Sequence, residues 1–355
     1  MTSTAVRIPV RIPVRDLARP LTSTRRKHMR YRPVAAAVAL ATSLVLGTQA
    51  PVRAAELDFD RPDPAPGNLR FGWIHGSQSA KHNTDLRIQV HRYEEHTYIL
   101  RQNPAVHWEA PFMYLLFGAD RALLIDSGAT EEAEYFPLRE TVDALITRWA
   151  EANGRPVPEL IVLATSDAPA QTAGLVQFED RPATTVIAPT VAELTDALAL
   201  DSWPTGTAQL DLGGRVLDVL PTPGVSTAGL SIHDPWTDML FTGTTVLPGR
   251  IVIRDFDAYM ASIERLVAFS ENNPVRWVMG AQIDMSRTPG VDYRLRSTYR
   301  PTERALQLDA THLVTARNVT KLVNGREQIE ILADFIIMNG VGRGARRYGY
   351  PVYSP

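Results

Sequence analysis

The sequence contains no cysteine. Disulfide bonds, thiolate metal sites and cysteine nucleophiles are therefore excluded, and the fold has to be stabilised by its hydrophobic core. With 355 residues, of which 45% are hydrophobic, the chain is long enough to bury one large core or two modest ones. Repeats of the length found in solenoid proteins are also missing, which excludes array architectures.

An excess of positive charge is lacking too, since the formal net charge is -2. We therefore expect no nucleic acid among the partners of the protein. The basic residues are nevertheless concentrated at the beginning of the chain. Residues 1–54 contain ten of the 37 Lys and Arg residues and one acidic residue, Asp16.

This basic leader has the features of an export signal. An apolar run over residues 34–46 is followed by small residues. Val52 with Ala54 has the spacing of a signal-peptidase site, and Thr48 with Ala50 offers a second one. The run is shorter than the roughly 20 residues that a membrane span needs, so we expect no stable span after cleavage. Residues 24–29 also resemble a twin-arginine signal. The leader over residues 1–54 therefore predicts export, to the cell surface or beyond it.

Composition divides the rest of the chain into three parts. Residues 55–94, rich in Pro and Asp near their start, are expected to form an extended connector and a segment at the edge of a cleft. Residues 95–312 are expected to form the folded domain. Residues 313–355 are expected to form a C-terminal helix, over residues 328–338, and a flexible tail.

Hydrophobic periodicity within the folded domain alternates between strand-like and helix-like segments. Strands are expected over residues 96–102, 112–117, 122–125, 160–164, 186–188, 216–220 and 239–242. Helices are expected over residues 136–152, 191–199 and 256–269. The pattern predicts an α/β fold in which mixed sheets are covered by helices.

Four segments resemble, in the same order, those of a known superfamily. They are residues 112–130, Leu-Pro-Thr-Pro-Gly at 220–224, Phe-Thr-Gly-Thr-Thr at 241–245 and Pro-Val-Arg-Trp-Val-Met-Gly at 274–280. Over roughly residues 95–300 the chain resembles the metallo-β-lactamase-fold hydrolases. The resemblance implies an αββα sandwich, in which two mixed sheets pack face to face between outer helices and the site lies at one edge.

The resemblance also implies catalytic zinc, but the side chains that would bind it are replaced. The signature Thr-His-x-His-x-Asp-His of the superfamily falls on residues 165–171, and three further ligands, His, Asp and His, fall on later loops. The residues at these seven positions are Ser166, Ala168, Ala170, Gln171, Val225, Thr244 and Gln282. Zinc sites need imidazole nitrogen and carboxylate oxygen, so we expect no metal ligands and no cofactor.

Three ionisable residues near these positions are candidate catalytic residues. Asp167 stands beside a lost ligand position, although it is equally a residue type that caps the turn after it. Asp126 resembles the buried Asp beside the metal site of the superfamily, and its structural alternative is to accept backbone hydrogen bonds at a strand end. His107 precedes the opening strand, and with Glu109 it is expected at the mouth of the cleft.

One later loop also resembles the superfamily. It contains Arg250, Arg254 and Asp255, in the pattern Pro-Gly-Arg-x-x-x-Arg-Asp. The simplest interpretation is structural: these charged residues form exposed salt bridges. We therefore assign them no role in binding at this stage.

Two kinds of function are compatible with the sequence. In the first, the cleft binds a small molecule without metal, as a binder or scaffold or as an enzyme repurposed for proton transfer, cyclisation or elimination. In the second, the protein hydrolyses an ester, lactone or thioester, with water activated by Asp167 or by a His outside the family motif. The first is favoured, because without metal the water keeps a pKa near that of bulk water and one general base contributes only about two to four orders of magnitude.

Overall fold

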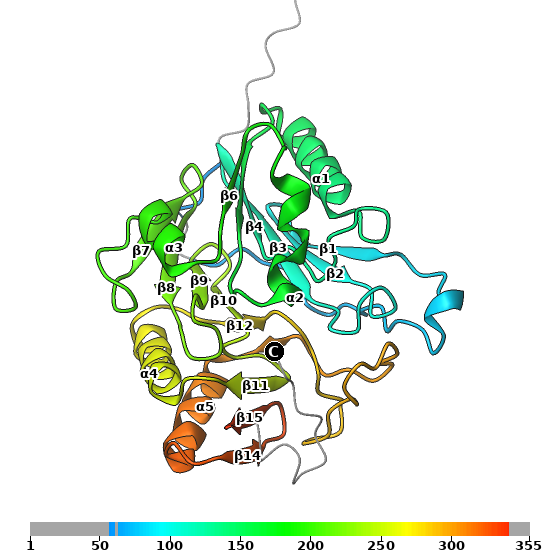
Figure 1. The fold of residues 1–355 in the computed structure, drawn as a ribbon. Coiled ribbons are helices and arrows are strands. Elements are labelled where there is room, and N and C mark those ends of the chain that lie inside the picture. Colours follow the sequence, from blue (N-terminus) through cyan, green and yellow to red (C-terminus); the bar gives the residue numbers. More distant parts are fainter. Residues whose placement is uncertain (1–56, 61–62, 341–355) are drawn as a thin grey trace, which may run out of the picture. The chain divides into compact units, whose positions relative to one another are not determined.

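The computed structural model describes residues 57–60 and 63–340 (Figure 1). These residues belong to a single structural unit, residues 51–355. The predicted leader, its cleavage site and the part of the predicted flexible tail beyond residue 340 lie outside the described residues. Within the described residues, no helix has both the length and the apolar composition needed to cross a bilayer.

The first half of the folded unit forms a six-stranded sheet. Its elements are β1 (Ile88–Glu94), β2 (Thr97–Gln102), β3 (Phe112–Phe117), β4 (Arg121–Ile125), α1 (Leu138–Asn153), β5 (Glu159–Leu163), α2 (Pro169–Thr172), the 3-10 helix η2 (Ala173–Phe178) and β6 (Thr184–Ile187). The strands are ordered as in the sequence, antiparallel from β1 to β4 and parallel from β4 to β6. Helices connect the parallel strands, as the β-α-β pattern of the sequence predicts.

The second half forms another six-stranded sheet and a small third sheet. Its elements are α3 (Val191–Ala197), β7 (Ala208–Asp211), β8 (Val216–Pro221), β9 (Leu230–Asp234), β10 (Met239–Gly243), β11 (Arg250–Ile253), α4 (Phe256–Asn272), β12 (Trp277–Gly280), β13 (Gln307–Leu308), α5 (Ala310–Val323), β14 (Gln328–Ile331) and β15 (Ile336–Asn339). The larger sheet has the order β13-β12-β10-β9-β8-β7, and β11-β15-β14 form the third. A short 3-10 helix, η1 (Ala80–His82), precedes β1.

The two large sheets pack face to face through one buried hydrophobic cluster. Tyr114 of β3 and Phe241 of β10 meet there, with ring centroids 4.6 Å apart. Successive side chains of a strand point to opposite faces of the sheet. Leu123 and Ile125 of β4 therefore join this cluster between the sheets, whereas Leu124 joins the cluster on the outer face. Each buried aliphatic or aromatic side chain contributes about 1.5–3 kcal/mol through the hydrophobic effect.

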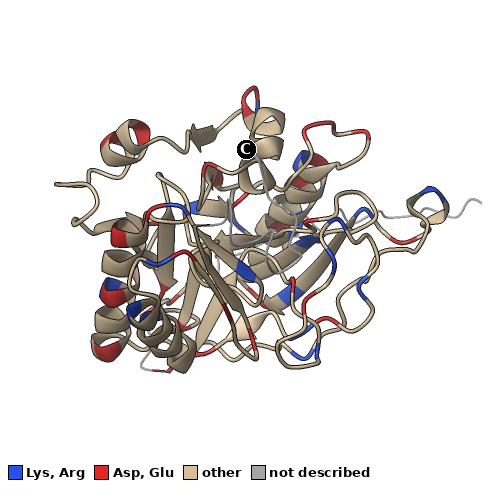
Figure 2. Ribbon diagram, turned by 60° about the horizontal axis from the view of Figure 1, so that its bottom comes forward, with Lys and Arg blue, Asp and Glu red and all other residues tan. Residues whose placement is uncertain are grey.

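Helices cover the outer faces of both sheets. On the first, Trp149 of α1 stacks on Phe117 of β3, with ring centroids 4.7 Å apart. On the second, Ile263 of α4 and Leu313 of α5 pack with Leu240 of β10. Charged residues lie mainly on helices and connecting loops (Figure 2). The layers are helix, sheet, sheet and helix, so the predicted αββα sandwich is confirmed.

The structure corrects the expectations at both ends of the domain. The helices expected over residues 136–152, 191–199 and 256–269 are present as α1, α3 and α4. The helix expected over residues 328–338 is wrong, because this segment is the hairpin of β14 and β15, and the C-terminal helix is α5 instead. Isoleucine is β-branched and favours strands, and β15 gains a parallel partner in β11. At the other end, β1 lies inside the expected connector over residues 55–94.

Candidate functional site

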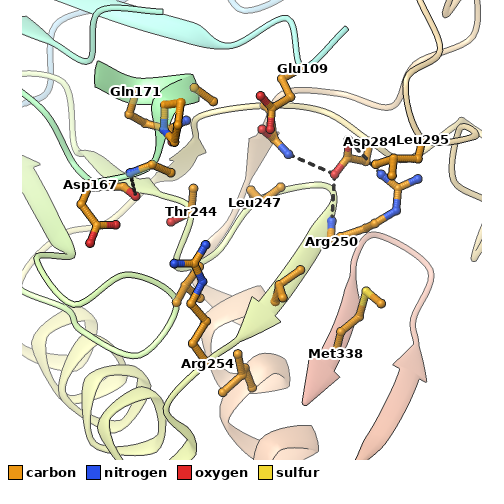
Figure 3. Close-up of a pocket in the computed structure, with 18 of the residues that line it drawn as sticks. Glu109, Asp167, Gln171, Thr244, Leu247, Arg250, Arg254, Asp284, Leu295 and Met338 are labelled. Atoms are coloured by element: carbon orange, nitrogen blue, oxygen red, sulfur yellow. Dashed lines mark hydrogen bonds and ion pairs between the residues drawn. The ribbon is translucent and has the colours of Figure 1, made fainter. Parts of the chain in front are cut away.

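A cavity of about 950 Å³ lies where loops of the two large sheets and the third sheet meet (Figure 3). Its walls come from the segments after β5, β8, β10 and β12, from the β2–β3 loop and from β11 and β15. All seven residues at the expected ligand positions line it: Ser166, Ala168, Ala170, Gln171, Val225, Thr244 and Gln282. Asp167 and His107 line it as well, but Asp126 does not. Folding thus brings together residues that are spread over more than a hundred positions of the chain.

The side chains at the seven positions do not fit zinc. Three are alkyl groups, two are hydroxyls and two are amides, whereas zinc requires imidazole, thiolate or carboxylate ligands. Among the described residues, no group of three or more His, Cys, Asp or Glu side chains could hold a metal ion. The chemistry of the cavity has to be sought in its other polar residues.

Asp126 directly follows β4 and holds the loop after β5. Its side chain is buried, and its Oδ1 accepts hydrogen bonds from the Thr165 backbone N–H at 2.7 Å and from the Thr165 hydroxyl at 2.9 Å. Burial raises the pKa of Asp126 to about 7, against the hydrogen bonds from Thr165, which lower it. This geometry is the structural alternative expected for Asp126, an acceptor of backbone hydrogen bonds at a strand end.

Asp167 does not cap the helix that follows it. The N-cap of α2 is Ala168, and no side chain caps it. Instead, the Ser226 hydroxyl donates to Asp167 Oδ1 at 2.8 Å, and the Asp167 backbone N–H donates to Ser226 Oγ at 3.2 Å. Ser226 is only 4% exposed. The loop after β5 is therefore tied to the loop after β8, and the Asp167 carboxylate is held in a fixed orientation at the wall of the cavity.

His107 and Glu109, which both line the cavity, form a pair. His107 Nδ1 lies 3.7 Å from Glu109 Oε2 and accepts the Glu109 backbone N–H at 3.3 Å, which places the proton of a neutral imidazole on Nε2. Burial raises the pKa of Glu109 to about 7, helped by Asp284 and opposed by Arg300. Burial and Arg300 lower the pKa of His107. Near neutral pH, Glu109 is therefore close to half protonated and His107 is mostly uncharged.

The prediction that Arg250 and Asp255 form exposed salt bridges is wrong. Arg250 forms largely buried ion pairs with Asp284, at 3.3 Å, and with Asp292, at 2.7 Å. Burial acts to raise the pKa of Asp284, but Arg250 and Arg300 outweigh it and the pKa is lowered. Asp255 caps α4 by accepting the Ala258 backbone N–H at 3.0 Å.

Sequence reasoning missed Asp284, although it lines the cavity. A usable signal was its place two residues after Gln282, the last expected ligand position. In the structure, Gln282 Nε2 donates to Asp284 Oδ2 at 3.2 Å, which fixes one of the two cavity amides. The second amide, that of Gln171, has no such partner among the described residues.

Arg254 directly follows β11, the strand that begins at Arg250, and its side chain points into the cavity (Figure 3). Its guanidinium has no hydrogen-bond or ion-pair partner within the part of the chain that the structure describes. The backbone beneath it is well fixed, since the N–H groups of Arg254 and Asp255 both donate to the Gly224 carbonyl, at 2.9 and 3.0 Å. Gly224 has a φ of +130°, and a Cβ there would lie 2.4 Å from Tyr259 Cα, so only glycine fits.

No family model matches the chain, and no curated protein matches it. Among solved structures, the chain is similar to a metallo-β-lactamase from Pontibacter korlensis, with 16% identity, coverage of 66% of this chain and 99% of that chain, and a TM-score of 0.44. It is also similar to TMB-1, with 12% identity, coverage of 68% of this chain and 100% of that chain, and a TM-score of 0.43. A third similar structure is DIM-1 metallo-β-lactamase exposed to ceftazidime, with 12% identity, coverage of 68% of this chain and 100% of that chain, and a TM-score of 0.44. At these identities the likeness concerns the fold alone.

Proposed function

We propose that the protein binds a small molecule in this cavity and does so without a metal ion. The observation that carries the proposal is that all seven positions expected to bind zinc line one cavity and offer no zinc-binding side chain. The volume of about 950 Å³ lies near the upper end of the range of small-molecule pockets, about 300–1,000 Å³.

The open cavity supports binding over a purely structural role. If the cleft had become part of a core, large apolar side chains would be expected at the former ligand positions, because protein interiors are close-packed. Instead, Ala168 and Ala170 are small, and Gln171 brings a polar amide. A cavity with apolar walls and a few convergent polar groups is typical of a ligand site.

Glu109 and His107 support an enzyme rather than a pure binder. A carboxyl group with a pKa of about 7 both gives and takes a proton near neutral pH, as a general acid or base must. This fits a repurposed enzyme that catalyses proton transfer, cyclisation or elimination, in which Glu109 removes a proton from the bound ligand or returns one. Taking the proton converts the Glu109 carboxylate into the neutral acid, and returning it restores the carboxylate, so the proton is accounted for without a metal.

Metal content tests the proposal directly. Protein purified without chelator is analysed by elemental mass spectrometry and then titrated with zinc. We expect less than about a tenth of an equivalent of metal and no tight zinc binding. One or two tightly held equivalents would overturn the metal-free site.

The hydrolase alternative has its own assay. Metal-free protein is tested on nitrophenyl esters and on simple lactones and thioesters. We expect no turnover above that of the Asp167→Asn variant. Clear hydrolysis by the wild-type protein that this variant loses would replace our proposal with an enzyme in which Asp167 activates water.

Export through residues 1–54 forms a separate part of the proposal. It rests on the apolar run and the small residues at 52 and 54. N-terminal sequencing of protein recovered from outside the cytoplasm is expected to begin at Ala55, whereas an intact leader on all of the protein would contradict it.

A further inference from the structure

Three polar side chains toward one side of the cavity have unused hydrogen-bonding capacity. Asp167, Gln171 and Arg254 lie on that side in Figure 3, away from Leu295 and Met338. They come from the β5–α2 loop, from α2 and from the β11–α4 loop. Such convergence of polar groups from separate elements is typical of the part of a pocket that fixes the orientation of its ligand.

Gln171 gives the clearest sign of a missing partner. The residue is fully buried, yet neither Oε1 nor Nε2 of its amide has a hydrogen-bond partner among the described residues. Its backbone is held in place: the Gln171 carbonyl accepts from the Ser127 backbone N–H at 2.8 Å and from the Ser127 hydroxyl at 3.0 Å. A buried amide that lacks both partners is costly, so Gln171 calls for a partner beyond the described residues, such as a bound ligand.

Asp167 and Arg254 carry opposite charges but form no ion pair with each other within the described residues. Ser226 donates to Asp167 Oδ1, and Asp167 Oδ2 has no hydrogen-bond partner among the described residues. Within the described residues, none of the five N–H donors of the Arg254 guanidinium has a hydrogen-bond partner. A ligand with only a carboxylate would meet the negative charge of Asp167, and a ligand with only an amine would meet the positive charge of Arg254. A ligand with both groups would satisfy both side chains.

We propose that the cavity takes a small zwitterion of the α-amino acid type with a large apolar side chain, its carboxylate bound by Arg254 and its ammonium group by Asp167. The inference rests on the proposed small-molecule site. The Gln171 amide completes the pairing, since Nε2 donates to the carboxylate and Oε1 accepts from the ammonium group. The apolar side chain packs against the apolar walls, which include Leu247, Val252, Phe256, Leu295 and Met338.

Four probes that each contain one phenyl group separate the contributions of the ammonium group and the carboxylate to binding. They are L-phenylalanine, 3-phenylpropanoate without the amine, 2-phenylethylamine without the carboxylate, and neutral 3-phenylpropanamide. Isothermal titration calorimetry on the full chain is expected to show phenylalanine binding about 10- to 100-fold more tightly than each of the other probes, the range for one charge-assisted hydrogen bond.

Variants assign each charge to its residue. Arg254→Gln is expected to weaken phenylalanine binding about 10-fold or more and to strengthen 2-phenylethylamine binding, because the ammonium group no longer meets the positive charge of Arg254. Asp167→Asn is expected to weaken phenylalanine binding similarly and to strengthen 3-phenylpropanoate binding, because the carboxylate no longer meets the negative charge of Asp167. Arg92→Gln and Asp201→Asn, at exposed positions outside the cavity lining, serve as matched controls and should bind all four probes as the wild-type protein does.

The outcomes separate this inference from the proposed function. The inference of a zwitterionic ligand is wrong if 3-phenylpropanoate or the neutral amide binds as tightly as phenylalanine, or if neither variant weakens phenylalanine binding. The proposal of a metal-free small-molecule site is unaffected by either result. If no probe binds the wild-type protein, the zwitterion is wrong as well. If zinc binds tightly and is needed for any probe to bind, the proposed function itself fails.

Discussion

Replacing Asp126 by Asn should remove a specific pH dependence from the free energy of unfolding. Asp126 is 1% exposed, and its Oδ1 accepts two hydrogen bonds from Thr165. Asparagine has the same shape and keeps that acceptor, so the variant is expected to fold. What the substitution removes is the ability of this buried group to ionise.

The magnitude follows from the two pKa values of the carboxyl group. In the folded protein the pKa is raised from 3.8 to about 7, so the folded chain holds the proton more tightly than the unfolded chain does. The stabilisation is fully present below the unfolded value and is lost as the pH rises through about 7. The difference between the two values corresponds to about 4 kcal/mol. About 3 kcal/mol of it falls between about pH 4.5 and about pH 8.5.

Urea unfolding of both proteins at these two pH values measures the effect. Because all other groups titrate alike in both, the free energy of unfolding of Asp126→Asn minus that of the wild-type protein should increase by about 3 kcal/mol from the lower pH to the higher. Asp201→Asn, at an exposed position, is the control and should show a constant difference. A constant difference for Asp126→Asn would mean that Asp126 is ionised in the folded protein throughout, and would refute the reasoning.

Three further predictions concern the walls of the cavity. Gly224→Ala places a Cβ 2.4 Å from Tyr259 Cα at a φ of +130°, and it should lower the stability by at least about 1–3 kcal/mol, measured as the shift in thermal unfolding; an unchanged Tm would contradict the close approach. Asp284→Asn leaves the two neighbouring guanidiniums without their buried carboxylate and should cost about 3–5 kcal/mol in denaturant unfolding, whereas a loss under about 1 kcal/mol would show that the pairs are solvated. The carboxyl 13C shift of Glu109 should titrate with a midpoint near pH 7, and a midpoint near the ordinary value of 4.5 would remove the basis for general acid or base catalysis.

Much of the fold could be predicted because its strands are short, fully apolar and separated by clear helical periodicity. The strand over residues 112–117 and the helix over residues 136–152 are examples in which burial alone specifies the pattern. The prediction of a helix over residues 328–338 failed because isoleucines at short spacing are compatible with both the helical and the strand period. Pairing with β11, more than eighty residues earlier, decided the outcome.

The position of the site could be predicted, but most of its contacts could not. Four loop segments in the right order located the cavity, because each follows a recognisable strand. The partner of Asp167 is Ser226, 59 residues away, and this contact overrides the local preference of Asp for capping. The ion pair between Arg250 and Asp284 joins residues 34 positions apart. Only the folded chain brings such residues together.

The parallel pairing of β11 with β15 has a consequence for biosynthesis. Met338, Asn339 and Gly340 line the cavity, so one wall is supplied by the last strand of the chain that the structure describes. During translation, the first sheet is complete more than a hundred residues before that strand leaves the ribosome. The strands β1–β6 are therefore synthesised well before the cavity has all of its walls, and the wall that contains Met338 forms only after β15 has paired with β11.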